Sequence, residues 1–278
     1  MDWWQAIVLG VVEGLTEFLP ISSTGHLTVV EKLMKLPVDD AGVTAFTAII
    51  QVGAILAVIG YFRRDIVRLI VAFVRGVGSP AARSDPSWRE ALAVIVGTIP
   101  IGVVGLAAKD FVSGPLRSLW VVAFALIAWS GVMVLAERRG RQDRGEESVT
   151  LRDALVVGAV QCVALVPGVS RSGATISGGL FRGLDRVAAT RLSFLLSIPA
   201  LVAAGGLEAV TSGSDVAASV GWGPTLLATL VSLLVAYAAI AWLLRLVAHH
   251  PITVFVPYRI ALAVVLIVVL ATGLLSAR

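Results

Sequence analysis

The sequence has little charge and almost no cysteine. Charged residues make up 14% of its 278 positions, histidine occurs three times, and the single cysteine is Cys162. One cysteine excludes an internal disulfide and any multi-cysteine metal site, and its place in an apolar run is typical of a small buried hydrophobe. The N-terminal stretch MDWWQAIVLG also lacks a basic n-region, so we expect no cleaved signal peptide.

Apolar residues dominate what remains. They account for 58% of the chain, and the mean hydropathy is +0.93, more than a soluble domain of this size needs. These values predict a polytopic all-α membrane protein, with room for roughly six to nine helical segments of about 20 residues. We expect one integral membrane domain over 1–278. The net charge of +4 lies largely in loop arginines, which indicates control of topology and not nucleic-acid binding.

Six apolar runs are long enough to cross a bilayer as complete helices. They cover residues 41–62, 90–108, 116–136, 191–210, 223–244 and 258–275. Two further runs, 3–34 and 154–182, are interrupted near their middle. The predicted breaks fall at Pro20, Gly25, Pro167, Gly168 and Gly173. Because proline removes a helix donor and clashes with the preceding turn, each run is predicted to form two half-helices joined by a polar loop, as in a re-entrant hairpin.

Arginine is unevenly distributed between the loops. The loop 63–89 holds six arginines and the loop 137–152 holds five, whereas 208–222 contains no lysine or arginine. The positive-inside rule therefore predicts that the first two loops are cytoplasmic and the third is external. Counting the spans from these loops, we predict that the first broken run lies on the outer side and the second on the inner side. Both chain ends are then predicted to lie outside.

The two broken runs are related in sequence. Aligned without gaps, 10–25 and 158–173 match at four positions, and Glu13 faces Gln161. The identities are Gly10 with Gly158, Val12 with Val160, Ser22 with Ser170, and Gly25 with Gly173. Three spans separate the halves, and an odd number reverses the orientation. We therefore predict inverted repeats, roughly 1–136 and 150–278, an architecture in which broken helices meet near the bilayer midplane and build a site.

Two carboxylates lie in the first broken run. Glu13 and Glu17 are four residues apart, which places both on one face of a helix. Each charge at bilayer depth costs about 3 kcal/mol on insertion scales, so such groups are usually paired, metal-bound or lining water. A shallow position at the interface is the alternative. Beside a phosphate anion, this pair predicts a divalent cation, Mg²⁺ or Ca²⁺. Gln51 is explained by interhelical hydrogen bonding, whereas Gln161 is a candidate for the site.

Hydroxyl groups follow both breaks, in ISSTGH after Pro20 and in VSRSGAT after Pro167. Helix N-termini with free N–H groups and nearby hydroxyls bind anions, and Arg171 adds a guanidinium that grips phosphate bidentately. The predicted phosphate contacts are Ser22, Thr24, Gly168, Ser170, Ser172 and Gly173. For Ser172 and Ser177, ordinary small-residue helix packing fits equally well. His26 is near enough to act as a base for a serine nucleophile such as Ser23, or as an acid for the leaving group.

The motifs EGLTEFLPISSTGH and PGVSRSGAT, with the flanking FTAIIQVGAILAV, GTIPIGVVG and RLSFLLSIPAL, resemble bacterial undecaprenyl-diphosphate phosphatases of the bacitracin-resistance type. The resemblance covers nearly the whole chain. It implies a plasma-membrane enzyme whose site faces the external side and which converts undecaprenyl diphosphate to the monophosphate carrier of peptidoglycan synthesis. Bacitracin acts on the same lipid. The resemblance also implies a homodimer.

The resemblance further implies roles for individual residues. Glu13 and Glu17 fill the paired acidic motif, while Ser22, Ser23 and His26 fill the hydroxyl and histidine motif. The second phosphate-binding motif comprises Ser170, Arg171 and Thr175. The nucleophile is open between Ser23 and His26. On chemical grounds we favour Ser23, with His26 assisting, Arg171 neutralising phosphate oxygens and Glu17 holding the cation.

Two alternatives compete with this interpretation. A second family of polyprenyl-diphosphate phosphatases uses a histidine nucleophile in a late motif, but this chain has no Arg-Pro dipeptide and no histidine within ten residues after Arg171. The other alternative is a transporter or flippase for an anionic lipid or solute. Inverted repeats with buried carboxylates are typical of that class, and it stays open either alone or as a second role.

Overall fold

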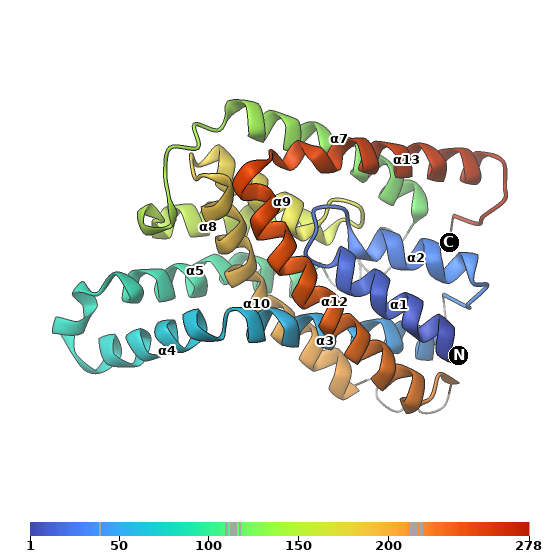
Figure 1. Ribbon diagram of the computed structural model, residues 1–278, viewed down its shortest axis with the longest axis horizontal. Helices are drawn as coiled ribbons and strands as arrows, with labels where there is room; N and C mark the ends of the chain where they lie inside the picture. The colour runs from blue at the N-terminus through green and yellow to red at the C-terminus, as the bar shows by residue number, and fades with distance from the viewer. Residues whose placement is uncertain are drawn as a thin grey trace.

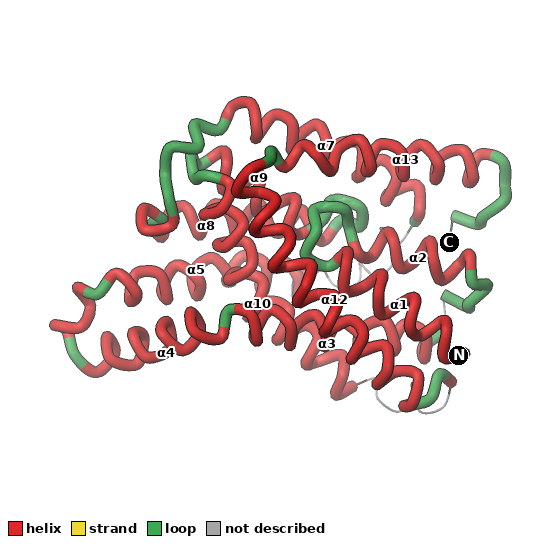
Figure 2. The backbone as a smooth tube through the Cα atoms, viewed as in Figure 1, coloured by secondary structure: helices red, strands yellow, loops and turns green. Residues whose placement is uncertain are grey.

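The chain folds into helices joined by short loops (Figure 2). The computed structural model describes residues 1–38, 40–108, 111, 116, 118–211, 216 and 219–277, with the backbone alone for 207–211. Among these residues, all regular secondary-structure elements are helices and none is a strand. The predicted all-α class is confirmed.

Six helices are long and apolar enough to cross a membrane, as predicted. They are α3 (Ala41–Tyr61), α5 (Pro86–Ala107), α7 (Leu119–Arg139), α10 (Arg186–Thr211), α12 (Trp222–His249) and α13 (Val256–Ala271), the last preceded by the 3-10 turn η4 (Ile252–Phe255). Helix α5 begins four residues earlier than the predicted start, at Pro86. The reason is local: Asp85 Oδ1 accepts the Ser87 N–H at 2.8 Å as an N-cap, and Pro86 suits the first helical position.

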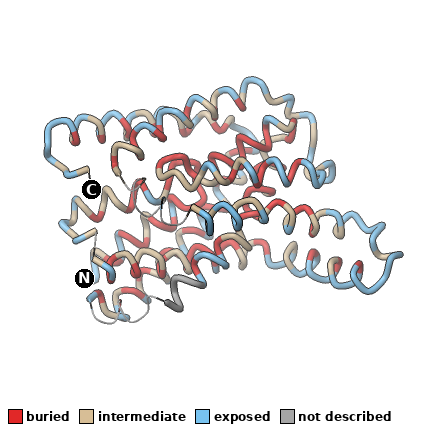
Figure 3. Tube along the Cα trace, turned by 180° about the vertical axis from the view of Figure 1, so that it is seen from behind, coloured by how far each residue is buried: buried red, intermediate tan, exposed pale blue. Residues whose placement is uncertain are grey.

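Part of the arginine-rich segment predicted as a loop is a helix. Helix α4 (Arg63–Gly78) continues the direction of α3 and runs beside α5 (Figure 1). The 3-10 turn η1 (Pro80–Ser84) joins α4 to α5. Arginines at 63, 64, 68 and 75 interrupt its apolar residues, so it was not recognised as a helix. Gly76 packs so closely on the Trp88 ring that a Cβ would not fit. The α4–α5 arm is mostly exposed, whereas burial is greatest at the centre of the molecule (Figure 3).

Both broken runs form helical hairpins. We name each hairpin after the membrane side predicted for it. The outer hairpin consists of α1 (Trp3–Thr16) and α2 (Ser23–Leu33); the inner hairpin consists of α8 (Leu151–Gln161), the 3-10 turn η3 (Cys162–Leu165) and α9 (Arg171–Phe181). Their tips are residues 17–22 and 162–170. The predicted breaks at Gly25 and Gly173 are wrong, because both glycines lie inside half-helices. Gly25 instead allows close packing: a Cβ there would lie 2.9 Å from Val122.

The hairpins enter from opposite ends of the molecule, and their tips meet near its middle (Figure 1). Helix α1 packs mainly on α12 of the second half, while α8 packs mainly on α5 of the first half. The matched glycines make both contacts. A Cβ on Gly10 would lie 2.5 Å from the Ala228 carbonyl oxygen, and Gly158 lies directly against Gly97. The packing is therefore reciprocal between the two halves, and the inverted repeat stays a prediction. Both chain ends lie at the same end of the molecule, as expected.

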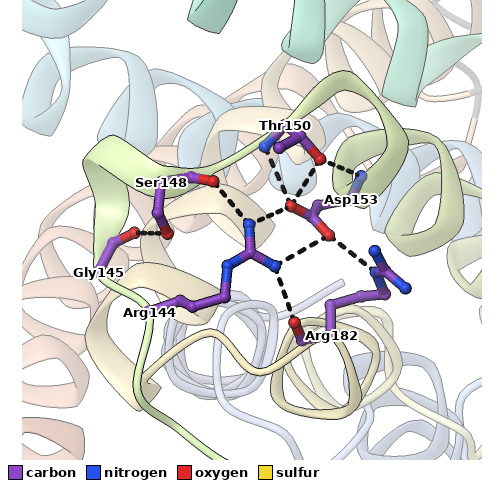
Figure 4. A network of polar contacts seen from close by, with 6 residues as sticks. All are labelled: Arg144, Gly145, Ser148, Thr150, Asp153 and Arg182. Atoms are coloured by element: carbon purple, nitrogen blue, oxygen red, sulfur yellow. Dashed lines mark hydrogen bonds and ion pairs between the residues drawn. The ribbon is translucent and has the colours of Figure 1, made fainter.

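The base of the inner hairpin is fixed by one buried carboxylate (Figure 4). Asp153 Oδ2 accepts from Arg144 Nη2 at 2.7 Å and from Thr150 Oγ1 at 2.7 Å, while Oδ1 accepts from Arg182 Nε at 2.8 Å. These contacts join the start of α8 to the end of α9. Burial alone would raise the pKa of Asp153, but the hydrogen bonds from Arg144, Thr150 and Arg182 outweigh it and hold the pKa well below its usual range.

Candidate active site

The two hairpin tips are interlocked by a pair of serines. Ser22 and Ser170 are the N-cap residues of α2 and α9, and their backbones share a conformation that is rare for residues other than glycine, with φ of 77° and 76°. Each hydroxyl reaches the opposite hairpin. Ser22 Oγ accepts the Gly168 N–H at 3.1 Å, and Ser170 Oγ donates to the Leu19 carbonyl at 3.4 Å. Strain of this kind persists only where the surroundings over-determine it.

Glu17 joins the chemistry of the two hairpins. Its Oε2 accepts from Ser23 Oγ at 2.7 Å, and its Oε1 accepts from Arg171 Nη2 at 3.2 Å. Glu17 is buried, so this ion pair lies in a medium of low dielectric constant, where charge interactions are strong. The structure therefore brings together the predicted nucleophile, the predicted phosphate ligand and one predicted acidic residue.

Two buried polar atoms beside this cluster have no hydrogen-bond partner among the described residues. They are Arg171 Nη1 and Glu13 Oε1. Buried polar atoms are nearly always satisfied, so such atoms point to a ligand. A guanidinium N–H offers a donor to an anion, and a carboxylate oxygen offers a ligand to a cation. Glu13 is only 1% exposed, so a negative charge on it would require a counter-charge nearby.

A polar cavity of about 320 Å³ adjoins the cluster. Glu13, Ser23 and Thr24 lie on its wall. The other lining residues come from α2, α3, α10 and the loop before α3: Leu27, Thr28, Glu31, Val38, Val43, Thr44, Thr47, Ala48, Gln51, Ala204 and Gly205. Gln51, which the sequence explained by interhelical bonding, is thus part of the cavity wall. Glu31 was not identified from the sequence; its Oε1 accepts from Thr47 Oγ1 at 2.7 Å.

His26 lies beside the cluster but contacts other groups. Its Nδ1 is 2.7 Å from the Ser22 carbonyl oxygen, and its Nε2 is 2.6 Å from the Tyr258 hydroxyl oxygen. The ring of Tyr258 stacks on the imidazole. Since a carbonyl can only accept, Nδ1 carries a proton and donates it to Ser22, while Nε2 and the Tyr258 hydroxyl share a second hydrogen bond. Ser23 is hydrogen-bonded to Glu17. The expected contact between His26 and Ser23 is not formed in this arrangement, because both ring nitrogens of His26 bond to other groups.

The remaining predicted phosphate contacts do not line this cavity. Ser172 Oγ is 3.1 Å from Ser170 Oγ, the Gly173 N–H donates to Ser170 Oγ at 3.2 Å, and Thr175 Oγ1 donates to the Arg171 carbonyl at 2.8 Å. Gly168 has a φ of 98° and its N–H is bonded to Ser22. These groups support the inner tip. Gln161 is completely buried, and neither polar atom of its side chain has a partner among the described residues.

Tyr258 and Arg259, at the start of α13, were also missed. In the sequence they look like the first residues of the last apolar run. Arg259 is completely buried, and its bonds to both hairpin tips are described below. A charged residue in an apolar run was the only available signal, and nothing in its spacing pointed to partners 90 or more positions away.

Fold and site together define an integral membrane protein of the all-α class, with a buried site suited to a phosphate group. The bacitracin resistance protein BacA family matches residues 6–265, and the chain belongs to this family.

Three relatives illustrate the similarity. An undecaprenyl-diphosphatase 3 of Frankia casuarinae is 58% identical over 277 residues and the match covers 100% of both chains. An undecaprenyl-diphosphatase of Cutibacterium acnes is 53% identical over 284 residues, again with 100% coverage of both. An undecaprenyl-diphosphatase 1 of Streptomyces coelicolor is 55% identical over 275 residues, which cover 98% of this chain and 97% of the relative.

Proposed function

We propose that this chain hydrolyses undecaprenyl diphosphate to undecaprenyl phosphate and inorganic phosphate. The product is the lipid carrier of peptidoglycan synthesis, and its recycling confers resistance to bacitracin, which acts on the diphosphate. The names and high identity of the relatives support this activity. The structural observation that carries it is the bridge through Glu17, which holds a hydroxyl from the outer hairpin and a guanidinium from the inner one. The comparisons give no support to the transport alternative.

In the proposed reaction, Ser23 Oγ attacks the terminal phosphorus while Glu17 Oε2 takes the serine proton. The bond from that phosphorus to the bridging oxygen breaks, and undecaprenyl phosphate leaves with the electron pair. Water then attacks the same phosphorus, the bond to Ser23 breaks, and the proton on Glu17 returns to the serine as inorganic phosphate leaves. The Ser23–Glu17 distance of 2.7 Å supports Glu17 as the general base.

Arg171 provides electrostatic stabilisation. One of its terminal nitrogens is fixed on Glu17, which leaves Nη1, the atom without a partner among the described residues, to donate to a phosphoryl oxygen. A donor held in place before the reaction stabilises the charge that develops in the transition state without reorganisation. The ring of Phe18 lies 5.6 Å from the guanidinium carbon and restricts the arginine further.

A divalent cation fits the donor set. Within the described ranges, no group of three or more His, Cys, Asp or Glu side chains converges into a metal site. Mg²⁺, however, is commonly held by one or two carboxylates together with substrate phosphates and water. We assign Glu13 and Glu17 as the protein ligands. When bound, the cation neutralises diphosphate charge that would otherwise be repelled by the two carboxylates.

The proposed location is the bacterial plasma membrane, with the site open to the external side. The arginine-rich α4 and the start of α8, which carries Asp153, lie at the end of the molecule opposite the chain termini (Figure 1). This arrangement supports a cytoplasmic assignment for that end. The cavity beside Glu13 is lined by α2 and α3, whose outward ends lie near the termini. A homodimer stays a prediction.

The activity is tested by measuring phosphate release from undecaprenyl diphosphate with the purified protein in detergent. We expect release that stops when the divalent cation is chelated and that is lost in Glu17→Gln. The control is Glu147→Gln, a change to an exposed glutamate of the inner loop. If the wild-type protein releases no phosphate, or if Glu17→Gln and Glu147→Gln release it equally, the proposal fails. A lipid-flux assay in liposomes would then test the transport alternative.

A further inference from the structure

Arg259 is a buried arginine that bonds to both hairpin tips. Its side chain on α13 is completely inaccessible to solvent. Its nitrogens donate to five acceptors: Pro20 O at 2.8 Å, Gly168 O at 3.0 Å, Val169 O at 3.2 Å, Ser130 Oγ at 3.0 Å and Leu126 O at 3.4 Å. Three of these are tip carbonyls, and the other two belong to α7. A single side chain thus connects the outer tip, the inner tip and a spanning helix.

The chemistry of these contacts requires arginine. A buried charge costs several kcal/mol unless its hydrogen bonds are satisfied, and no carboxylate forms an ion pair with Arg259 within the described part of the chain. Its charge is solvated by backbone carbonyls. The planar guanidinium offers five donors in a fixed fork, whereas a lysine ammonium is a compact charge on a flexible stem. Lysine would keep the charge but could not hold carbonyls of both tips at once.

The contacts lie next to the reacting groups. Pro20 is three residues from both Glu17 and Ser23, and Gly168 is three residues from Arg171. Fixing the Pro20 and Gly168 carbonyls on one guanidinium therefore fixes the spacing between the Ser23–Glu17 pair and the arginine that reaches it. The serine contacts described above run between the tips but do not tie them to a spanning helix; Arg259 does.

We propose that Arg259 is a positioning residue, which holds the two hairpin tips in register so that Ser23, Glu17 and Arg171 meet around the phosphate. The inference rests on the proposed function for its activity readout. It assigns Arg259 no contact with the substrate, because all of its nitrogens already donate to the tip carbonyls and to α7.

The test compares Arg259→Lys with the wild type in two measurements. In phosphate release, we expect kcat to fall on the order of 10²-fold, since small misplacements of reacting groups cost this much, with KM changed by less than about threefold. In hydrogen exchange followed by mass spectrometry, we expect about tenfold faster exchange in peptides covering 17–22 and 162–170, with α3 and α12 unchanged. A purely global loss of stability would not produce this local pattern.

Two further variants frame the result. Arg245→Lys, a change to an exposed arginine of α12, is the matched control and should behave as the wild type. Ser130→Ala removes one of the five acceptors and should lower kcat by about threefold, which provides a readout even where Arg259→Lys folds poorly.

Three outcomes would overturn the proposal: wild-type turnover in Arg259→Lys, reduced turnover with unchanged exchange at both tips, or faster exchange spread evenly over the protein. If the wild type itself releases no phosphate, the proposed function fails, while the exchange data still decide whether Arg259 holds the tips.

Discussion

The outer and inner hairpins share a backbone but differ in charge. Both pack a glycine tightly on a helix of the opposite half, and both begin their second half-helix with a serine at a φ near 76°. The outer hairpin, however, has Glu13 and Glu17 where the inner one has Gln161 and Leu165, and Ser23 stands opposite Arg171 in the alignment. The shared backbone builds the meeting point of the tips, and the differing side chains supply complementary chemistry to it. Neither hairpin carries the proposed nucleophile, the proposed base and the proposed cationic group together.

The ion pair that crosses between the hairpins gives the largest expected effect. Glu17→Gln should lower kcat/KM about 10³-fold because it removes the proposed general base, and Arg171→Met should lower kcat/KM by roughly 10²-fold to 10³-fold. The double variant should be close to the worse single variant, since the two residues act as a unit.

These three variants form a double-mutant cycle, and its matched control is the ion pair between Arg186 and Glu137. Arg186→Lys should leave kcat/KM within about twofold of the wild-type value. Multiplicative losses at Glu17 and Arg171 would contradict the coupling across the hairpins.

The next largest effect concerns the hydroxyl that only the outer hairpin carries at this position. Ser23→Ala should lower kcat by about 10² or more, because the bond to Glu17 and the attacking oxygen are both lost. Thr24→Ala, a change to the neighbouring hydroxyl on the cavity wall, should cost about tenfold or less. The measurement is phosphate release under single-turnover conditions. Full activity in Ser23→Ala would remove Ser23 as nucleophile and leave His26 as the candidate.

A smaller effect should follow from changing the first acidic position. Glu13→Gln should raise the Mg²⁺ concentration needed for half-maximal activity on the order of tenfold, since it removes one of the two proposed cation ligands. The reverse change in the other hairpin, Gln161→Glu, should leave the Mg²⁺ requirement as it is. Titration of activity against Mg²⁺ checks both. An unaltered requirement in Glu13→Gln would place the cation elsewhere.

The smallest effect on chemistry is expected at the base of the inner hairpin. Asp153→Asn should leave kcat within a few-fold but lower the free energy of unfolding at pH 7 by about 3 kcal/mol, because it breaks a buried charge pair. The pKa of Asp153 is held low in the folded protein, so its contribution is present above the unfolded value of about 4 and is lost as the pH falls toward the folded value.

Thermal unfolding in detergent should therefore separate the wild type from Asp153→Asn at neutral pH, and the two should converge at strongly acidic pH. Asp143→Asn is the control, because Asp143 is exposed in the same loop. A difference in stability that grows on acidification would reject this account.

Much of the fold follows from the sequence because hydrophobic length determines the spans and proline determines the breaks. All six spans were located in this way, and the predicted breaks at Pro20, Pro167 and Gly168 lie in the observed tips, whereas those at Gly25 and Gly173 do not. The two tips could be expected to meet because the repeat reverses between the halves. Helix α4 could not be found by length and hydropathy, since arginines break its apolar pattern and its stability comes from packing on α5.

The site was predicted only in part, for a physical reason. Residues inside the motifs, such as Glu17 and Arg171, carry their chemistry in their type and spacing. The partners of these motifs cannot be identified by type and spacing, because they lie far away in the sequence. Tyr258 contacts His26 from 232 positions away, and Arg259 contacts Pro20 from 239 positions away. Sequence spacing also could not show that Ser23 bonds to Glu17 in preference to His26, because that choice depends on how the imidazole is rotated toward Tyr258.

The interlocked tips have a consequence for the order in which the protein assembles. Ser22 binds an amide that lies 146 residues later in the chain, so at typical synthesis rates its partner emerges roughly 7 to 30 seconds afterwards. Arg259 follows later still. The outer hairpin is therefore inserted first, before the partners of its tip have been synthesised. The last spanning helix then adds the final contacts at the centre of the molecule. Truncation near the C-terminus would remove the final connection that completes a structure begun at the N-terminus.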